Sequence, residues 1–219
     1  MNEVPRLASA RRVGTGLAFV VFPLVFVFAF AVHPGLLHPR LLGPAELVLR
    51  ARGDRLLQFA HALVLLDTAL LVVVALHFMK LLDHGAWAWA GFVGAVLAVP
   101  GALALAADKG ALCLTMSALD GLTDAEFAAM MPGLLAMFSK QGWMVLLWGI
   151  LLLPLGFGLQ AFALLKSGVL ARWQGGLFLL GVLLVGTPDG VEVVNLSASV
   201  LMAVALVPYG WRWLRGGRR

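Results

Sequence analysis

Charged residues are scarce in this sequence, and their scarcity excludes an ordinary soluble fold. Asp, Glu, Lys and Arg together make up 12% of its 219 residues, whereas about 25% is typical of a soluble domain. Hydrophobic residues make up 62%, and the mean hydropathy is +0.97. So few charges cannot cover a water-facing surface. We therefore predict an all-α, polytopic membrane protein that forms a single integral membrane domain over residues 1–219.

Cysteine is nearly absent as well. Cys113 is the only one, which excludes an internal disulfide and any zinc or iron–sulfur site built on a cysteine pair. Copper bound by Cys113 and Met116 would suit the soft ligands, but the pattern is weak. The net charge of +5 does not indicate nucleic-acid binding, because Lys and Arg fall mainly between or beyond apolar runs and form no long basic arm.

Six apolar runs approach the roughly 20 residues that a helix needs to cross the hydrocarbon core. They cover residues 14–33, 56–82, 86–107, 142–165, 169–187 and 191–213. The first run follows three arginines, as in a secretory signal peptide. Its apolar core, Leu17 to Val32, is at or beyond the upper end of the usual length of about 7–15 residues, so we expect it to be retained.

The positions of the cations predict an orientation. With six spans, the side that holds both termini collects ten Lys and Arg residues, and the opposite side collects six together with eight of the eleven acids. The positive-inside rule then places both termini in the cytoplasm. The first loop carries four arginines and argues the other way.

Two connections are longer than turns. Residues 35–54 mix leucines with arginines, which is typical of an amphipathic segment on the membrane surface. The second connection covers residues 108–140. Within it, Thr123 and Glu126 match a capping box that would start a helix with an apolar face. We expect that helix to pack on the bundle as a lid or to rest among lipid headgroups.

Asp67 is the acid that lies deepest in an apolar run. It lies about eleven residues into the second run, roughly 16 Å along a helix and near the bilayer midplane. A charge there needs a partner or a proton, and acids at such depth often mark ligand, ion or proton pathways. A neutral acid hydrogen-bonded to a neighbouring helix would explain the residue equally well.

The last apolar run carries a polar stripe near its start. Glu192, Asn195 and Ser199 recur at spacings of three and four, so they share one helical face. Helix capping and interhelical hydrogen bonding are the ordinary explanations for such residues. His61 and His33 lie at a similar depth in the predicted topology, although they could simply be solvated. One outer-half pocket could collect six side chains, those of His33, His61, Asp67, Glu192, Asn195 and Ser199.

Histidine pairs in helix bundles can hold haem, but the spacing here is poor. His61 and His77 are sixteen residues apart, which rotates them by about 160° on a helix. A single haem held by His33 and His61 is the arrangement that the spacing still permits, and the sequence signal for it is weak. The sequence has no zinc-protease, phosphate-loop or nucleophile-elbow motif. We therefore predict no cofactor.

One region resembles a known family. Residues 148–160, 164–173 and 175–181 combine a glycine-rich apolar segment, a Lys-Ser-Gly turn, an Arg-Trp pair and a glycine-containing helix. This pattern is similar to the fourth-to-fifth helix region of an uncharacterised six-span bacterial membrane protein family, although this chain has Ala171 where that family usually has proline. The resemblance covers about a third of the chain. It implies six helices and a bacterial cytoplasmic membrane, and it brings no activity with it.

Three functions fit these patterns. The first is binding of a small hydrophobic or amphipathic ligand, or of a partner subunit, in a cavity polarised by Asp67 and the Glu192 face. The second is a proton-coupled transporter that uses Asp67. The third, a membrane enzyme with an Asp67 and Glu192 acid–base pair, has no nucleophile or metal constellation to support it. We lean away from an enzyme and expect the lipid bilayer as the surroundings.

Overall fold

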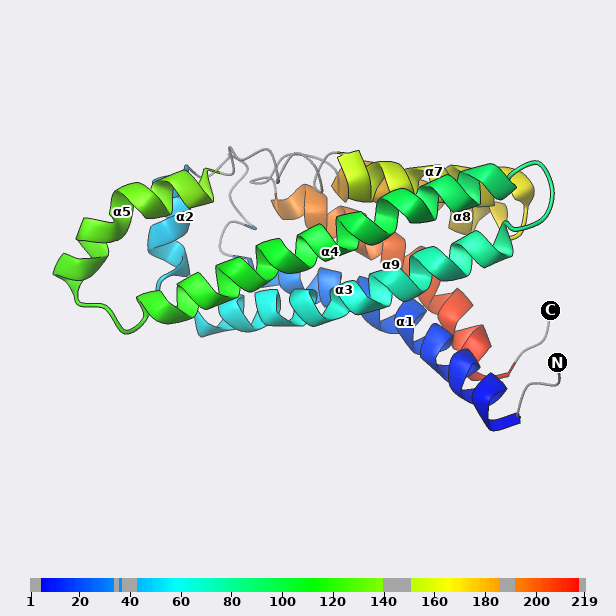
Figure 1. Ribbon diagram of the computed structural model, residues 1–219, viewed down its shortest axis with the longest axis horizontal. Helices are drawn as coiled ribbons and strands as arrows, with labels where there is room; N and C mark the ends of the chain where they lie inside the picture. The colour runs from blue at the N-terminus through cyan, green and yellow to red at the C-terminus, as the bar shows by residue number, and fades with distance from the viewer. Residues whose placement is uncertain (1–4, 34–35, 37–42, 140–150, 186–191, 217–219) are drawn as a thin grey trace.

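The computed structural model describes residues 5–33, 36, 43–139, 151–185 and 192–216 (Figure 1). Within these ranges every regular element is a helix, as predicted. The helices are α1 (Pro5–Ala31), α2 (Pro44–Ala51), α3 (Arg55–Leu81), α4 (Ala88–Leu119), α5 (Asp124–Phe138), α7 (Leu153–Ser167), α8 (Arg172–Val185) and α9 (Glu192–Leu214).

Four of these helices are long and apolar enough to cross a membrane. They are α1, α3, α4 and α9, whose candidate spans have 23 to 32 residues. They correspond to the first three and the last of the six predicted apolar runs. Helices α7 and α8 have 15 and 14 residues. Residues 142–150 of the fourth run and 186–187 of the fifth lie outside the described ranges. The four long helices support a membrane protein.

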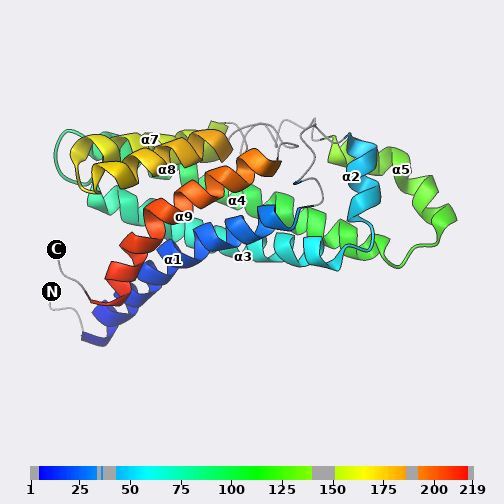
Figure 2. The same cartoon turned by 180° about the vertical axis from the view of Figure 1, so that it is seen from behind.

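The helices pack as a ring of antiparallel neighbours. Around the ring, α1 contacts α3, α3 contacts α4, α4 contacts α7, α7 contacts α8, α8 contacts α9, and α9 returns to α1. Figures 1 and 2 show both chain termini at one end of this bundle and helices α2 and α5 at the other. We call these the termini end and the α2/α5 end. The main apolar core lies inside the ring and includes Phe19, Phe78, Phe178 and Leu206.

Small residues let neighbouring helices approach closely. On α4, Gly94 and Gly101 face α7, and on α7 Gly156 faces the backbone of Ala98. Lipid tails are as apolar as leucine side chains, so helices in a membrane associate through close packing rather than through the hydrophobic effect. The α4–α7 contact therefore depends on these glycines.

Helix α4 is longer than the sequence predicted. The third apolar run was expected to end at Ala107, with a connection from Asp108 onward, but the helix continues through Asp108 and Lys109 to Leu119. At about 1.5 Å per residue its 32 residues measure roughly 48 Å, more than the roughly 30 Å of a hydrocarbon core. The ends of α3 and α4 therefore extend past the rest of the bundle and carry α2 and α5 (Figure 1).

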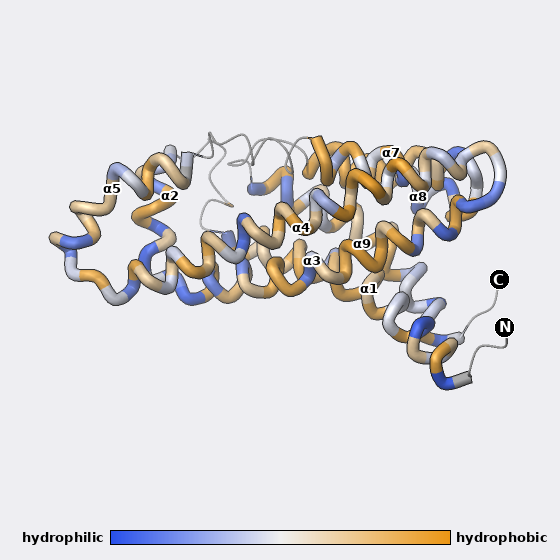
Figure 3. The backbone as a smooth tube through the Cα atoms, viewed as in Figure 1, coloured by the Kyte–Doolittle hydropathy of each residue, from blue (hydrophilic) through white to orange (hydrophobic). Residues whose placement is uncertain are grey.

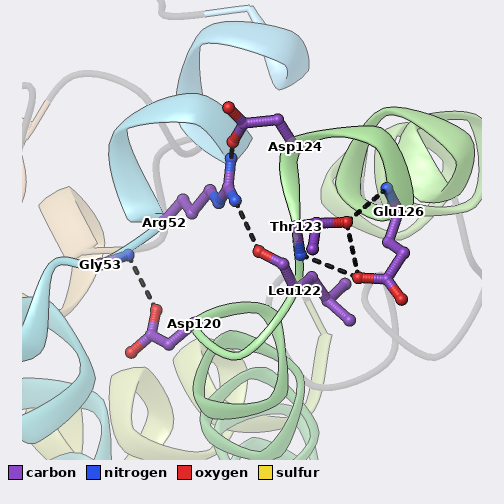
Figure 4. A network of polar contacts seen from close by, with 7 residues as sticks. All are labelled: Arg52, Gly53, Asp120, Leu122, Thr123, Asp124 and Glu126. Carbon is purple, nitrogen blue, oxygen red and sulfur yellow. Dashed lines mark hydrogen bonds and ion pairs between the residues drawn. The ribbon is translucent and has the colours of Figure 1, made fainter.

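A polar network holds α2 and α5 against this extension (Figure 4). The Arg52 guanidinium donates to Asp124 Oδ1 and to the Leu122 carbonyl, each at 2.9 Å. The amide of Gly53 and the side chain of Gln58 donate to the two oxygens of Asp120, at 2.9 and 2.8 Å. The hydrogen bond from Gln58, followed by that from Gly53, lowers the pKa of the exposed Asp120 carboxyl.

The predicted capping box at the start of α5 is confirmed. Thr123 Oγ1 accepts from the Glu126 amide, and the Glu126 carboxylate accepts from the Thr123 amide at 2.8 Å. Thr123 Oγ1 also donates to Glu126 Oε2 at 2.7 Å, and this hydrogen bond, followed by that from the Thr123 amide, lowers the pKa of the Glu126 carboxyl. Phe127 and Leu134 then pack on Val48 and Leu119. The helix thus packs on α2 and the end of α4, while a role as a lid on the bundle and contact with headgroups stay predictions.

The charged residues separate between the two ends, and Figure 3 shows hydrophilic segments at both. The alternating helix directions bring cations from five helices, α1, α3, α7, α8 and α9, to the termini end. These cations are Arg6, Arg11, Arg12, Lys80, Lys166, Arg172, Arg212 and Arg215. At the α2/α5 end, arginines are mixed with acids such as Asp120 and Asp124. This separation is the pattern from which the orientation was predicted.

Candidate functional site, a central cavity with a polar end

A cavity of about 70 Å³ lies inside the helix ring. Helices α1, α3, α7, α8 and α9 each contribute to its wall. The lining residues are Phe22, Phe26, Leu71, Leu153, Pro154, Phe157, Phe178, Val182, Val185 and Met202. Every one of these side chains is apolar. One water molecule needs about 10–15 Å³ of such volume, and cavities with apolar walls stay dry and take apolar ligands.

Asp67 lies one helical turn from the cavity wall. On α3 it precedes Leu71 by four residues, which places both on one face of the helix. Its side chain is turned into the bundle, since the residue is 3% exposed while the adjacent Leu66 is 71% exposed. Neither carboxylate oxygen has a hydrogen-bond partner within the described residues. The structure thus turns this acid inward, away from lipid.

The polar stripe of α9 approaches the same cavity from another side. Glu192, Asn195 and Ser199 are all buried, and Met202, three residues beyond Ser199, lines the cavity. Ser199 Oγ donates to the Asn195 carbonyl at 2.8 Å, a bond within its own helix rather than between helices. Asn195 Nδ2 lies 3.5 Å from Glu192 Oε2, and Asn195 Oδ1 has no partner in the part of the chain that the structure describes.

Three of the six predicted residues form a cluster at the start of α9. His33 Nδ1 lies 3.4 Å from Glu192 Oε1, and Asn195 contacts the same carboxylate. We call His33, Glu192 and Asn195 the α9 cluster. Like Asp67, it lies on the side of the cavity that faces the α2/α5 end. Helices α3 and α9 both run toward the termini end (Figure 1), and in each helix the polar residues precede the residue that lines the cavity, Leu71 or Met202.

Asp67 and the α9 cluster lie toward the same side of the cavity, although the lining residues include neither, and they do not contact each other directly. Among the described residues, no hydrogen bond or ion pair joins Asp67 to the cluster. His61 is half-buried on α3, and six residues separate it from Asp67, about 240° around the helix. The side chains of His61 and Asp67 therefore leave α3 in different directions. Common binding by all six residues stays a prediction.

Asp108 and Lys109 are partly buried charges that were predicted to lie in a connection. Their side chains are each 15% exposed, and Lys109 Nζ lies 3.2 Å from Asp108 Oδ2. Leu65 of α3 lies opposite Gly110 of α4, so in this antiparallel pair Asp67 is level with Asp108. Asp108 and Lys109 follow the buried Leu105 by three and four residues, and this helical spacing could have indicated that the helix continues.

Two glutamines were also missed. Gln160 is fully buried, and its Nε2 donates to the carbonyls of Ala75 and Gly91 at 2.9 and 3.1 Å, which links α7 to α3 and α4. Gln174 Nε2 donates to the Ala205 carbonyl at 2.8 Å, which links α8 to α9. A glutamine within an apolar run was the available signal, since such side chains hydrogen-bond across membrane helices.

The histidines and the cysteine have contacts of their own. His77 Nε2 lies 2.8 Å from Tyr209 Oη, at the termini end. Cys113 Sγ lies 3.8 Å from the Gln58 carbonyl. Within the described ranges no three His, Cys, Asp or Glu residues gather as metal ligands would. Haem between His33 and His61 remains an untested prediction.

Comparisons with protein-family models, with curated proteins and with solved structures found no match to this chain. The resemblance of residues 148–181 to a six-span family therefore stays an expectation, and the functional argument depends on the cavity and the residues around it.

Proposed function

We propose that this protein binds a small hydrophobic or amphipathic ligand in the central cavity of a six-span bundle. The single observation that carries the proposal is a cavity lined by apolar side chains inside a ring of helices, with buried polar side chains further toward the α2/α5 end. Ligand sites are typically apolar hollows with a few polar groups that fix orientation. The groups assigned to this role are Asp67, Glu192, Asn195, Ser199, His61 and His33.

Filling the cavity should remove the ligand. Val182 is 5% exposed and lines the cavity. In Val182→Phe, the aromatic ring would therefore occupy part of the cavity. The protein would be purified in lipid nanodiscs, and copurifying lipids, quinones and other apolar molecules would be measured by mass spectrometry. We expect a molecule present at near-stoichiometric amounts in the wild type to be lost in the variant.

The matched control is Leu183→Phe on the same helix, where the side chain is 62% exposed and faces outward. It adds a ring at the lipid-facing surface and should retain the molecule. Val185→Phe fills the cavity from another position and guards against misfolding of the first variant. A molecule that stays bound in both cavity variants, or no copurifying molecule in the wild type, would contradict the proposal.

The buried state of Asp67 favours a second candidate, a proton-coupled transporter. Both of its carboxylate oxygens are buried and unpartnered within the described residues, and it lies beside a hollow that could hold a cargo. Acids in such places take part in proton relays. The enzyme hypothesis has gained no comparable support.

Asp67→Asn tests this candidate. The amide keeps the shape of the side chain but cannot bind and release the proton. In proteoliposomes that hold a pH-sensitive dye, we expect wild-type protein to mediate proton flux in the presence of its cargo and the variant to lose it, with unchanged size-exclusion behaviour. Equal flux from both proteins would argue against a role for Asp67.

We further propose that the membrane is the bacterial cytoplasmic membrane and that both termini lie in the cytoplasm. The support is the concentration of cations at the termini end, where only one acid, Asp83, is found among the described residues. The positive-inside rule assigns such an end to the cytoplasm. The polar end of the cavity would then face the outer half of the bilayer.

A further inference from the structure

Near the polar end of the cavity, three buried oxygen atoms have no partner among the described residues, and all three are hydrogen-bond acceptors when Asp67 is ionised. They are Asp67 Oδ1, Asp67 Oδ2 and Asn195 Oδ1, on residues that are 3% and 2% exposed. Buried polar atoms in folded proteins nearly always find a partner, and each exception calls for an explanation. A group that completes this site must therefore donate hydrogen bonds.

The protein supplies no cation for Asp67 within the described residues. Along the bundle axis, Asp67 lies at the same height as Asp108 across the α3–α4 interface. The cation closest to Asp67 in height is therefore Lys109. Lys109 is engaged with Asp108 at 3.2 Å. The negative charge of Asp67 would thus be balanced by something that is not part of the described chain, such as a bound proton or a bound cation.

We propose that the ligand of the central cavity is a protonated alkyl amine or a similar amphipathic cation. Its apolar chain occupies the cavity, and its N–H groups donate to Asp67 and, for a larger head group, to Asn195 Oδ1. This assignment rests on the proposed function, because it names the class of ligand that the same cavity takes.

The dimensions of the site limit such a molecule to a short chain, because a cavity of about 70 Å³ is smaller than the roughly 150 Å³ that holds benzene. Along α3, Asp67 lies four residues from Leu71 of the cavity wall, about 6 Å at 1.5 Å per residue. Along α9, Asn195 lies seven residues from Met202, about 10 Å. A head group beside Asp67 thus lets a short attached chain of a few carbons reach the cavity.

The same groups disfavour other amphipathic molecules. A fatty acid would place its carboxylate beside Asp67 and Glu192, where like charges repel. An alcohol has one donor and no charge, so it cannot form the charge-assisted hydrogen bond that an ammonium group forms with a carboxylate. The order of affinity should therefore be amine, alcohol, carboxylate.

Equilibrium binding of radiolabelled butylamine, butanol and butyrate, whose chains are short enough for this cavity, would test this order. The protein would be held in nanodiscs of phosphatidylcholine, a zwitterionic lipid, and binding to empty nanodiscs would be subtracted. We expect butylamine to bind wild-type protein at least about tenfold more tightly than butanol, and butyrate to bind least. In Asp67→Asn, the preference for the amine should disappear, while butanol still binds and reports an intact cavity.

Each result separates this inference from the function on which it rests. Equal binding of butylamine and butanol to wild-type protein, sensitive to Val182→Phe but not to Leu183→Phe, would overturn the cationic head group and keep the cavity as a ligand site. An amine preference that survives in Asp67→Asn would overturn the role of Asp67. If Val182→Phe removes the binding of none of the three compounds, both the inference and the proposed function are overturned.

Discussion

Gly156→Ala should destabilise the bundle severely for so small a change. A Cβ atom at this position would lie 2.7 Å from the Gly94 carbonyl oxygen and would also clash with the backbone of Ala98. These atoms belong to the backbone of α4, so the clash can be relieved only if α7 moves away from α4. We expect a loss of about 1–3 kcal/mol in the free energy of unfolding, as for other overpacked interiors.

Gly158→Ala provides the matched control two residues along the same helix. There the added Cβ would meet only Val182 Cγ1, at 4.0 Å, an ordinary van der Waals contact. Both variants gain the same helix propensity, about 1 kcal/mol for alanine over glycine. Thermal unfolding in nanodiscs should therefore show Gly156→Ala well below the wild type and Gly158→Ala at or above it. Equal unfolding temperatures for the two variants would show that α4 and α7 do not approach as closely as described.

The apolar runs located the long helices well because hydropathy measures what it costs to place a residue in lipid. That measure carries no information about a helix that continues into a more polar setting. The end of α4 was missed for this reason, since Asp108 and Lys109 interrupt the apolar run but form an ion pair on the helix. The capping box at Thr123, by contrast, was found because its signal is local.

The candidate site was only partly predictable. Depth along a helix follows from counting residues, so Asp67 and Glu192 were identified as buried acids, and both are buried. The direction in which a side chain leaves its helix, relative to other helices, depends on which helices pack together. The contact of α1 with α9 closes the ring, and no periodicity within either helix predicts that pairing or the cavity that it encloses.

Gln160→Ala should produce the second large loss of stability. The wild-type side chain is fully buried at a joint of three helices and donates to the carbonyls of Ala75 and Gly91. Truncation removes both hydrogen bonds and leaves a hollow beside Gly94, against which the side chain packs. Large-to-small changes in tightly packed interiors cost about 2–5 kcal/mol, and we expect this variant to fall in that range.

Two further variants separate packing from hydrogen bonding at this joint. Gln160→Leu keeps most of the volume and should cost about 0.6–1.7 kcal/mol, from the average to the largest value measured for hydrogen bonds between membrane helices. Leu159→Ala removes a side chain that is 38% exposed on the adjacent position and should cost little, because lipid replaces the lost contacts. Unfolding in nanodiscs should thus rank Leu159→Ala, Gln160→Leu and Gln160→Ala in order of increasing damage. If Gln160→Leu matched the wild type, the two hydrogen bonds would contribute nothing and packing alone would hold α7 against α3 and α4.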